Sequence, residues 1–285
     1  MMMRLPRTGA GPSKLVLLRT ELSVRDERIL TFLNQHRYAT TTHLRDVFFA
    51  EHATPTAGTR ACIRVLHRLL HNRLIARLER RVGGTARGSA ATIWYLDAAG
   101  ERLTRPEGSR RRRFAAVSTP FLAHTLAVTD THVALIARAR TGAFEVERVD
   151  LEPDTWRPFV TSAGTAAILK PDLYADLATP EYDDHWYVEI DLGTESIPVL
   201  LAKCRTYAAY KATGRAQAEH GVFPRVLWLL PTQARVDRLR AAIQAAPELG
   251  DRLFVCATPG QLTEVLEDPD AFAAGAVDTE ERRRR

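Results

Sequence analysis

The sequence predicts a protein of the mixed α/β (α+β) class, in which a small domain of helices and one hairpin precedes a mixed sheet flanked by helices. Helical periodicity dominates the first hundred residues, and strand-like and helical segments alternate from Phe144 onward. The 285 residues are 45% hydrophobic and 26% charged, as in globular proteins. We expect a flexible N-terminus over 1–22, a first domain over 23–99, a basic linker over 100–117, a second domain over 118–268 and a tail over 269–285.

Charge is distributed unevenly along the chain. The formal net charge is +6, but residues 1–120 carry 22 Lys and Arg against 9 Asp and Glu, a net of +13, and the remainder carries a net of −7. A basic first part on an acidic remainder predicts that a polyanion binds the first part only.

Several classes of protein are disfavoured by the sequence. No apolar run approaches the roughly 20 residues that span a bilayer and no signal-peptide core is present, so we expect a cytoplasmic protein without membrane contact. Cys62, Cys204 and Cys256 are too few and too far apart for a disulfide scaffold or a CxxC zinc site. The phosphate-binding patterns GxxxxGK and GxGxxG and the GxSxG elbow are missing, which leaves little support for an enzyme of small molecules.

Three helices are expected in the first domain. Val24–His36 has apolar residues at helical spacing and follows Ser23, a favourable N-cap residue. A short helix should begin near Thr41, where a threonine again precedes apolar residues. A longer helix, Thr59–Asn72, follows a turn that contains proline and glycine.

The third helix is the most amphipathic segment of the chain. Its basic residues fall within one arc of about 100° on a helical wheel: Arg60, Arg64, His67, Arg68 and His71. The apolar residues occupy the opposite side: Ile63, Val65, Leu66, Leu69 and Leu70. A helix that packs on one face and presents arginines on the other is suited to the major groove of double-stranded DNA.

A glycine-rich hairpin should follow this helix. Two strand-like segments, Ile75–Leu78 and Thr92–Leu96, flank a loop that holds Arg80, Arg81 and Arg87. The order helix, short helix, basic helix and basic hairpin predicts a winged helix-turn-helix that binds DNA. The alternative is an ordinary three-helix domain with a solvated charged face.

The second domain should begin with a helix, Phe121–Arg140. Its His124 and His132 are better explained as structural residues than as metal ligands, because no carboxylate accompanies them. Strands and helices then alternate, which predicts a central mixed sheet covered by helices. The strands are Phe144–Leu151, Leu169–Leu177, Trp186–Leu192, Arg225–Leu230 and Leu253–Ala257, and the helices are Glu195–Ala212, Arg235–Ala245 and Gly260–Leu266.

Acidic residues in this sheet form the candidate site. Side chains alternate along a strand, so Glu189 and Asp191 share one face of Trp186–Leu192, where their repulsion favours a cation. Asp172 on the preceding strand could complete a set of oxygen ligands for Mg²⁺ or Mn²⁺. Lys203, on the helix that follows, could stabilise charge on a phosphate.

Pro171-Asp172 followed by Glu189-x-Asp191 resembles the PD-(D/E)xK nuclease core. The run from Leu169 to Tyr210, together with a winged helix, resembles the replication-relaxation family of plasmids and integrative elements, over about residues 23–267. This resemblance implies a restriction-endonuclease-like fold and a role in plasmid replication, DNA relaxation or mobilisation, with double-stranded DNA as a partner. Other replication or transfer proteins could be further partners of this chain.

The chain departs from the nuclease pattern at one position. Asp191 stands where the pattern has lysine, and Lys203 or Lys170 could replace that lysine. One hypothesis is therefore metal-dependent nicking by Asp172, Glu189, Asp191 and Lys203. Another is a non-catalytic origin-binding factor or transcriptional regulator. Covalent attack by Tyr207 or Tyr210 is a third idea, although aromatic residues on such a helix are more often core residues.

Overall fold

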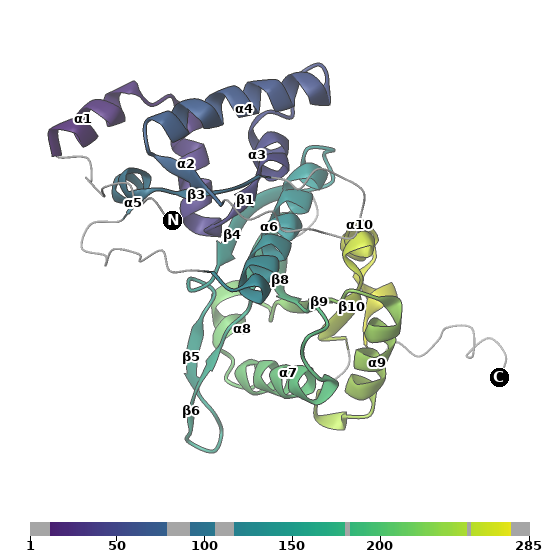
Figure 1. Ribbon diagram of the computed structural model, residues 1–285. Helices are drawn as coiled ribbons and strands as arrows, with labels where there is room; N and C mark the ends of the chain where they lie inside the picture. Colours follow the sequence, from purple (N-terminus) through teal and green to yellow (C-terminus); the bar gives the residue numbers. More distant parts are fainter. Residues whose placement is uncertain (1–11, 79–91, 106–116, 180–182, 250–251, 275–285) are drawn as a thin grey trace. The chain divides into compact units, whose positions relative to one another are not determined.

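The computed structural model describes residues 12–78, 92–105, 117–179, 183–249 and 252–274 (Figure 1). The chain forms two compact units, residues 1–133 and 134–285. Helix α6 (Thr119–Ala139) belongs to the first unit up to Val133 and to the second from Ala134.

The first unit arranges helices around a three-stranded antiparallel sheet. Its strands lie in the order β1-β3-β2, with Ala39 opposite Trp94 and Ile75 opposite Leu96. In chain order its further elements are α1 (Pro12–Glu21), α2 (Val24–His36), β1 (Ala39–Thr40), α3 (Thr41–Phe48), α4 (Pro55–His71), β2 (Ile75–Arg77), β3 (Ile93–Leu96) and α5 (Ala98–Thr104).

Polar caps explain where the helices of this unit begin. The Ser23 hydroxyl accepts the N–H of Asp26, and the Asp26 carboxylate accepts the N–H of Ser23, which forms a capping box at α2. Thr40 caps α3 in the same way with His43, and Thr54 caps α4. The three helices and two strands predicted for this part of the chain are therefore present, with bounds shifted by a few residues.

Two helices lie in segments that we expected to be flexible or linking chain. α1 falls within residues 1–22, and its Leu18 is buried in the core of the first unit. α5 contains Gly100, where the linker was expected to start, and its Ala99 is buried in the same core. Helices of 10 and 7 residues are stabilised mainly by packing, which local sequence patterns do not reveal.

The second unit is built on a mixed five-stranded sheet, which confirms the predicted mixed α/β class. Its strand order is β10-β9-β8-β7-β4, in which β8, β9 and β10 run parallel and β7 is antiparallel to both of its neighbours. The strands are β4 (Glu145–Leu151), β7 (Leu173–Ala178), β8 (Asp183–Ile190), β9 (Arg225–Leu229) and β10 (Phe254–Ala257).

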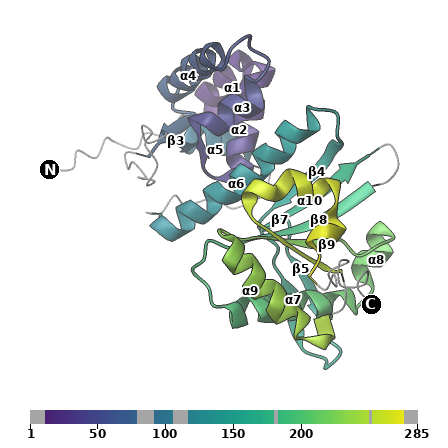
Figure 2. The same ribbon diagram turned by 90° about the vertical axis from the view of Figure 1, so that its right-hand side faces the viewer.

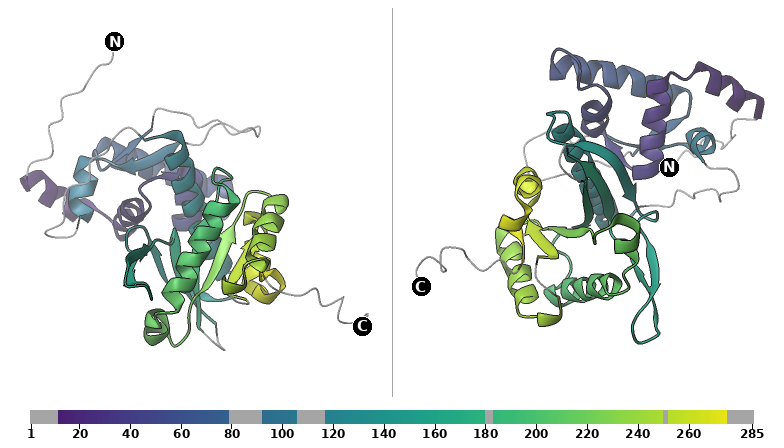
Figure 3. Two further views of the ribbon diagram at one scale, coloured as in Figure 1. Left: turned by 90° about the horizontal axis from the view of Figure 1, so that it is seen from below. Right: turned by 180° about the vertical axis from the view of Figure 1, so that it is seen from behind.

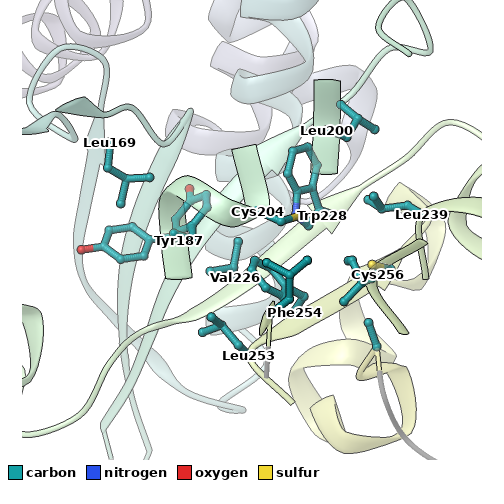
Figure 4. Close-up of a cluster of buried hydrophobic side chains, with 14 of the residues drawn as sticks. Leu169, Tyr187, Leu200, Cys204, Val226, Trp228, Leu239, Leu253, Phe254 and Cys256 are labelled. Atoms are coloured by element: carbon teal, nitrogen blue, oxygen red, sulfur yellow. The ribbon is translucent and has the colours of Figure 1, made fainter. Parts of the chain in front are cut away.

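Helices cover both faces of this sheet (Figures 2 and 3). α7 (Ile197–Lys211) and α9 (Gln233–Gln244) pack together on one face, and α10 (Leu262–Glu267) lies on the other face against β10. Between the sheet and α7–α9 lies a core in which Tyr187, Trp228 and Phe254 meet Cys204 from α7 (Figure 4). α8 (Arg215–His220) follows α7, and the hairpin of β5 (Arg157–Val160) and β6 (Ala166–Leu169) extends from the unit (Figure 3).

Two boundaries differ from the sequence analysis. The segment Leu169–Leu177 is not one strand: β6 ends at Leu169 and β7 starts at Leu173, because Pro171 has no N–H to donate to a ladder. Residues 269–274, expected in the tail, include a short 3₁₀ helix, and Ala273 and Ala274 are buried. Within the described residues, no helix combines the length and the apolar composition needed to cross a membrane.

Candidate functional sites

The basic face of α4 is exposed as the sequence analysis predicts. Its five candidate DNA contacts are all exposed: Arg60, Arg64, His67, Arg68 and His71. On the other side Cys62, Leu66 and Leu69 are fully buried, and Val65 and Leu70 pack beside them. Ile63 is the exception, because its side chain is 38% exposed rather than part of the core.

Arg68 has a structural partner within the first unit. Its guanidinium binds both carboxylate oxygens of Asp26, at 2.6 and 2.7 Å, and Asp26 is completely buried. The same carboxylate closes the capping box of α2, so Arg68 joins α4 to the start of α2. Arg60 and Arg64 have no such ion pair among the described residues and are the better candidates for contacts with a phosphate or a base.

The predicted wing falls mostly outside the described residues. β2 and β3 pair as an antiparallel hairpin, with Arg77 opposite Trp94. The three loop arginines, Arg80, Arg81 and Arg87, lie outside the part of the chain that the structure describes.

Asp172 and Glu189 come together in the second unit. β7 and β8 pair with Leu173 opposite Val188, and this register continued by one residue sets Asp172 opposite Glu189 on the same face. The Asp172 carboxylate accepts the backbone N–H of Ile190 at 2.7 Å. The two acids therefore adjoin on the face that α7 covers, as the candidate site requires.

Glu189 is fully buried and is held by two side chains of α7. One carboxylate oxygen pairs with the Lys203 ammonium and the other accepts the Tyr207 hydroxyl. Burial and the nearby Asp172 charge together raise the pKa of Glu189 to about 8, against the lowering effect of the Lys203 charge. Burial works against the ammonium of Lys203, but the Glu189 and Asp172 carboxylates outweigh it and raise the Lys203 pKa.

Asp191 lies on the same strand face but has a different partner. Arg235 of α9 binds both of its carboxylate oxygens, and the Gly193 N–H donates to one of them at 3.1 Å. Arg235 also donates to the carbonyl of Glu195 just before α7. Asp191 is thus neutralised by arginine and holds the turn between β8 and α7, next to the cluster of Asp172, Glu189 and Lys203.

Tyr207 and Tyr210 are core residues. Their exposed fractions are 0% and 3%, and the Tyr207 hydroxyl is occupied by Glu189. Burial, and then the Glu189 charge, raise the pKa of Tyr207 well above its usual value. A phosphodiester has no access to the Tyr207 hydroxyl, because Glu189 occupies it, whereas Tyr210 also lines a cavity of about 420 Å³ together with Arg157 and Arg215.

Two histidine clusters were not foreseen from the sequence. In the first unit His36 Nε2 bonds to His132 Nδ1 at 2.9 Å, and His36 Nδ1 bonds to the Thr129 hydroxyl at 3.1 Å. In the second unit Asp176, His185 and His220 bring possible ligand atoms within 4.8 Å of one another. Each cluster joins residues of different elements. For the cluster of Asp176, His185 and His220, the sequence offered one signal, namely that Asp176 and His185 lie on strands that follow one another in the chain and pair.

Comparison with known proteins identifies the family. The family model described as Replication-relaxation matches residues 30–226, which is more than half of the chain and includes α4, Asp172, Glu189 and Lys203. The chain therefore belongs to the replication-relaxation family, and the resemblance seen in the sequence is confirmed. This membership supports a role in the replication or relaxation of plasmid or mobile-element DNA. No curated protein and no solved structure matches the chain.

Proposed function

We propose that this protein binds duplex DNA of a mobile element through the first unit and nicks DNA with a divalent metal ion, Mg²⁺ or Mn²⁺, at the second. The observation that carries the proposal is that Asp172 and Glu189 are adjacent on one face of the sheet and that Lys203 of α7 pairs with the Glu189 carboxylate. This arrangement is what a PD-(D/E)xK-like site needs, with its lysine moved from the strand to the following helix. Family membership supports the same role.

The DNA-binding half of the proposal rests on the first unit. Its order of α2, β1, α3, α4, β2 and β3 is the order of a winged helix-turn-helix, in which the third helix enters the major groove. The corresponding helix here is α4, and it exposes Arg60 and Arg64. The net charge of +13 over residues 1–120 supports a polyanionic partner.

The residues present fit a two-carboxylate metal site better than the three-carboxylate site expected from the sequence. Mg²⁺ is commonly held by one or two carboxylates, with water and substrate phosphate completing the shell. Asp172 and Glu189 supply two oxygen donors in a buried place, where a cation compensates their negative charge. The Asp191 carboxylate already binds Arg235, so we assign it a structural role.

Each side chain then has a distinct task in hydrolysis. The ion, when bound, polarises the phosphate and lowers the pKa of a water molecule. Asp172 and Glu189 would hold this ion, with the Ile190 N–H orienting the Asp172 carboxylate and the Tyr207 hydroxyl orienting that of Glu189. Lys203 would stabilise negative charge on the phosphate oxygens. The water oxygen bonds to phosphorus as one phosphate ester bond breaks, which leaves a phosphate end and a hydroxyl end.

Nicking of supercoiled plasmid tests the catalytic half. Wild-type protein with Mg²⁺ should produce open circles on a plasmid that carries the origin of its own element, and Asp172→Asn should lower the rate at least about 100-fold by removing a charged ligand. Asparagine keeps an oxygen for the Ile190 N–H, so folding should persist. Asp154→Asn, at an exposed aspartate, is the matched control and should nick like the wild type. Equal nicking rates for Asp172→Asn and wild type, or no nicking by either protein, would contradict the proposed catalytic activity.

Binding to labelled duplex DNA tests the other half. Arg64→Ala should weaken binding by about 1–3 kcal/mol, or roughly 5- to 150-fold, because one arginine contact is lost. Arg19→Ala, an exposed arginine of α1, should bind like the wild type. Affinity should also fall steeply as salt rises from about 50 to 200 mM. If affinity scarcely changes with salt, α4 does not contact the phosphates.

A non-catalytic role is the second candidate, and one observation favours it. Both carboxylate oxygens of Glu189 already accept hydrogen bonds, from Lys203 and Tyr207, so the cluster is internally satisfied without an ion. In that case the protein is an origin-binding factor or a regulator. Arg64→Ala then abolishes plasmid maintenance, whereas Asp172→Asn leaves it intact.

A further inference from the structure

We propose that Asp176, His185 and His220 form a second metal site, selective for a divalent transition metal of the zinc class and separate from the carboxylate pair of Asp172 and Glu189. The proposal does not depend on nicking or on DNA binding. It rests on three potential ligands from three elements, β7, β8 and the end of α8, whose donor atoms lie within 4.8 Å of one another.

Strand pairing and a helix end bring the three side chains together. Asp176 and His185 are opposite each other in the β7–β8 register, and His185 Nδ1 lies 2.5 Å from Asp176 Oδ1. His220 enters from α8, with its ring centroid 4.8 Å from that of His185. Gly221, in the left-handed conformation at φ 75°, ends α8 directly after His220. The ligand set is thus fixed by strand pairing and by a helix end.

Tyr174 acts as a positioning residue at the centre of the cluster. Its hydroxyl donates to Asp176 Oδ1 and lies 3.2 Å from His185 Nδ1 and 3.4 Å from both ring nitrogens of His220. Side chains that hold ligands in this way are a regular feature of metal sites. Four polar side chains converge here in a largely buried place: the exposed fractions of the Asp176, His185 and His220 side chains are 16%, 15% and 9%.

The donor set determines which metal is expected. Two imidazoles and one carboxylate suit Zn²⁺ and its neighbours, whereas Mg²⁺ prefers an all-oxygen shell. Three protein ligands leave a position for water or an anion. A cavity of about 420 Å³ lies in the same part of the unit: its lining includes Glu219, the residue before His220, and Arg157, whose guanidinium lies 5.9 Å from the Tyr174 ring centroid.

Charges of both signs surround the cluster. Arg148, 5.8 Å from the Tyr174 ring, is ion-paired with Asp150 at 2.6 Å. Glu219 approaches His220 at 3.7 Å and adds a negative charge to the same surroundings. The positive charge of Arg157 lies 4.0 Å from the Asp150 carboxylate, and its guanidinium also donates to the carbonyl of Asp154.

Zinc titration of the full chain tests the proposal. Protein stripped with a chelator should bind one equivalent of Zn²⁺ at this site, and Co²⁺ in its place should give the visible absorption of a low-coordinate complex. His220→Ala and His185→Ala should each raise the Zn²⁺ dissociation constant at least about 100-fold, because a direct ligand is lost. Tyr174→Phe, which keeps all three ligands, should raise it about 10- to 100-fold.

Matched controls separate this site from other histidines and acids. His67→Ala, at an exposed histidine of α4, and Asp172→Asn should bind Zn²⁺ like the wild type. Millimolar Mg²⁺ should not compete. The proposal is overturned if wild-type protein shows no saturable Zn²⁺ binding, if His220→Ala and His185→Ala bind as tightly as the wild type, or if Asp172→Asn abolishes binding. Circular dichroism of each variant shows that the fold is kept, so that a lost signal reports a lost ligand.

Discussion

Replacing Gly100 by alanine is expected to unfold the first unit. An added Cβ at this position would stand 2.0 Å from the carbonyl oxygen of Leu74 and 3.2 Å from a methyl of Leu96. The Leu74 carbonyl also accepts the N–H of Asp97, so neither α5 nor the start of β2 can move without breaking this contact. We expect a loss of at least about 3 kcal/mol in the free energy of unfolding, the upper range for overpacking.

The sign of this effect makes the test decisive. Gly→Ala inside a helix normally stabilises by about 1 kcal/mol. Gly260→Ala, where the added Cβ meets nothing within 4 Å, should be nearly neutral, and Gly58→Ala, 2.8 Å from the Phe49 carbonyl, should be intermediate. Urea denaturation followed by circular dichroism measures the series, and hydrogen exchange assigns the loss to residues 12–105. A stabilised Gly100→Ala variant would show that α5 does not pack on Leu74.

Acid is expected to destabilise the first unit through His36 and His132. Burial lowers the pKa of His132 to about 4 and that of His36 well below its usual value. The unfolded chain binds these protons below about pH 6.5, whereas the folded chain binds the His132 proton only near pH 4. The contribution of this pair to the free energy of unfolding is therefore constant above pH 6.5 and falls between pH 6.5 and 4, by about 2 kcal/mol at pH 5 from His132 alone. His36 adds to this loss.

Urea denaturation at pH 7.5 and pH 5 measures this dependence. His132→Gln removes the titrating group, so its stability should depend less on pH than that of the wild type. His67→Ala, which alters an exposed histidine, should keep the full dependence. Identical pH dependence for His132→Gln and wild type would mean that the buried pair does not control acid stability.

The sequence predicted the elements with strong periodicity and missed those that packing stabilises. The helices α2, α4 and α6 and the strands β8, β9 and β10 were expected within a few residues of their bounds, because each has a long apolar face or a buried apolar run. α1, α5, α8 and the β5–β6 hairpin were missed, since none carries enough apolar periodicity to be recognised alone. Gly100 shows the limit well: composition suggested a linker, and a close backbone approach explains the glycine.

The candidate site was predicted in part. Strand alternation was sufficient to place Glu189 and Asp191 on one face, and the register of β7 and β8 brings Asp172 beside Glu189. The sequence could not show which basic side chain pairs with Asp191 and which with Glu189. Arg235 lies 44 positions from Asp191, and Lys203 reaches Glu189 from a helix whose rotation depends on the core. The cluster of Asp176, His185 and His220 was missed for the same reason, because His220 is distant in sequence.

The way β7 begins has a consequence for reading related sequences. The Pro171 carbonyl accepts the Thr155 hydroxyl at 2.6 Å, and the Ile190 N–H turns to the Asp172 side chain instead. The aspartate therefore satisfies a backbone N–H where the pairing of β7 and β8 ends, and this structural role alone is a reason for a homologue to keep it. Within the described part of the chain, Lys203 of α7 pairs with the Glu189 side chain and makes no side-chain hydrogen bond to the backbone. Under the proposed function, homologues that lack that lysine but keep the aspartate are expected to be inactive in nicking.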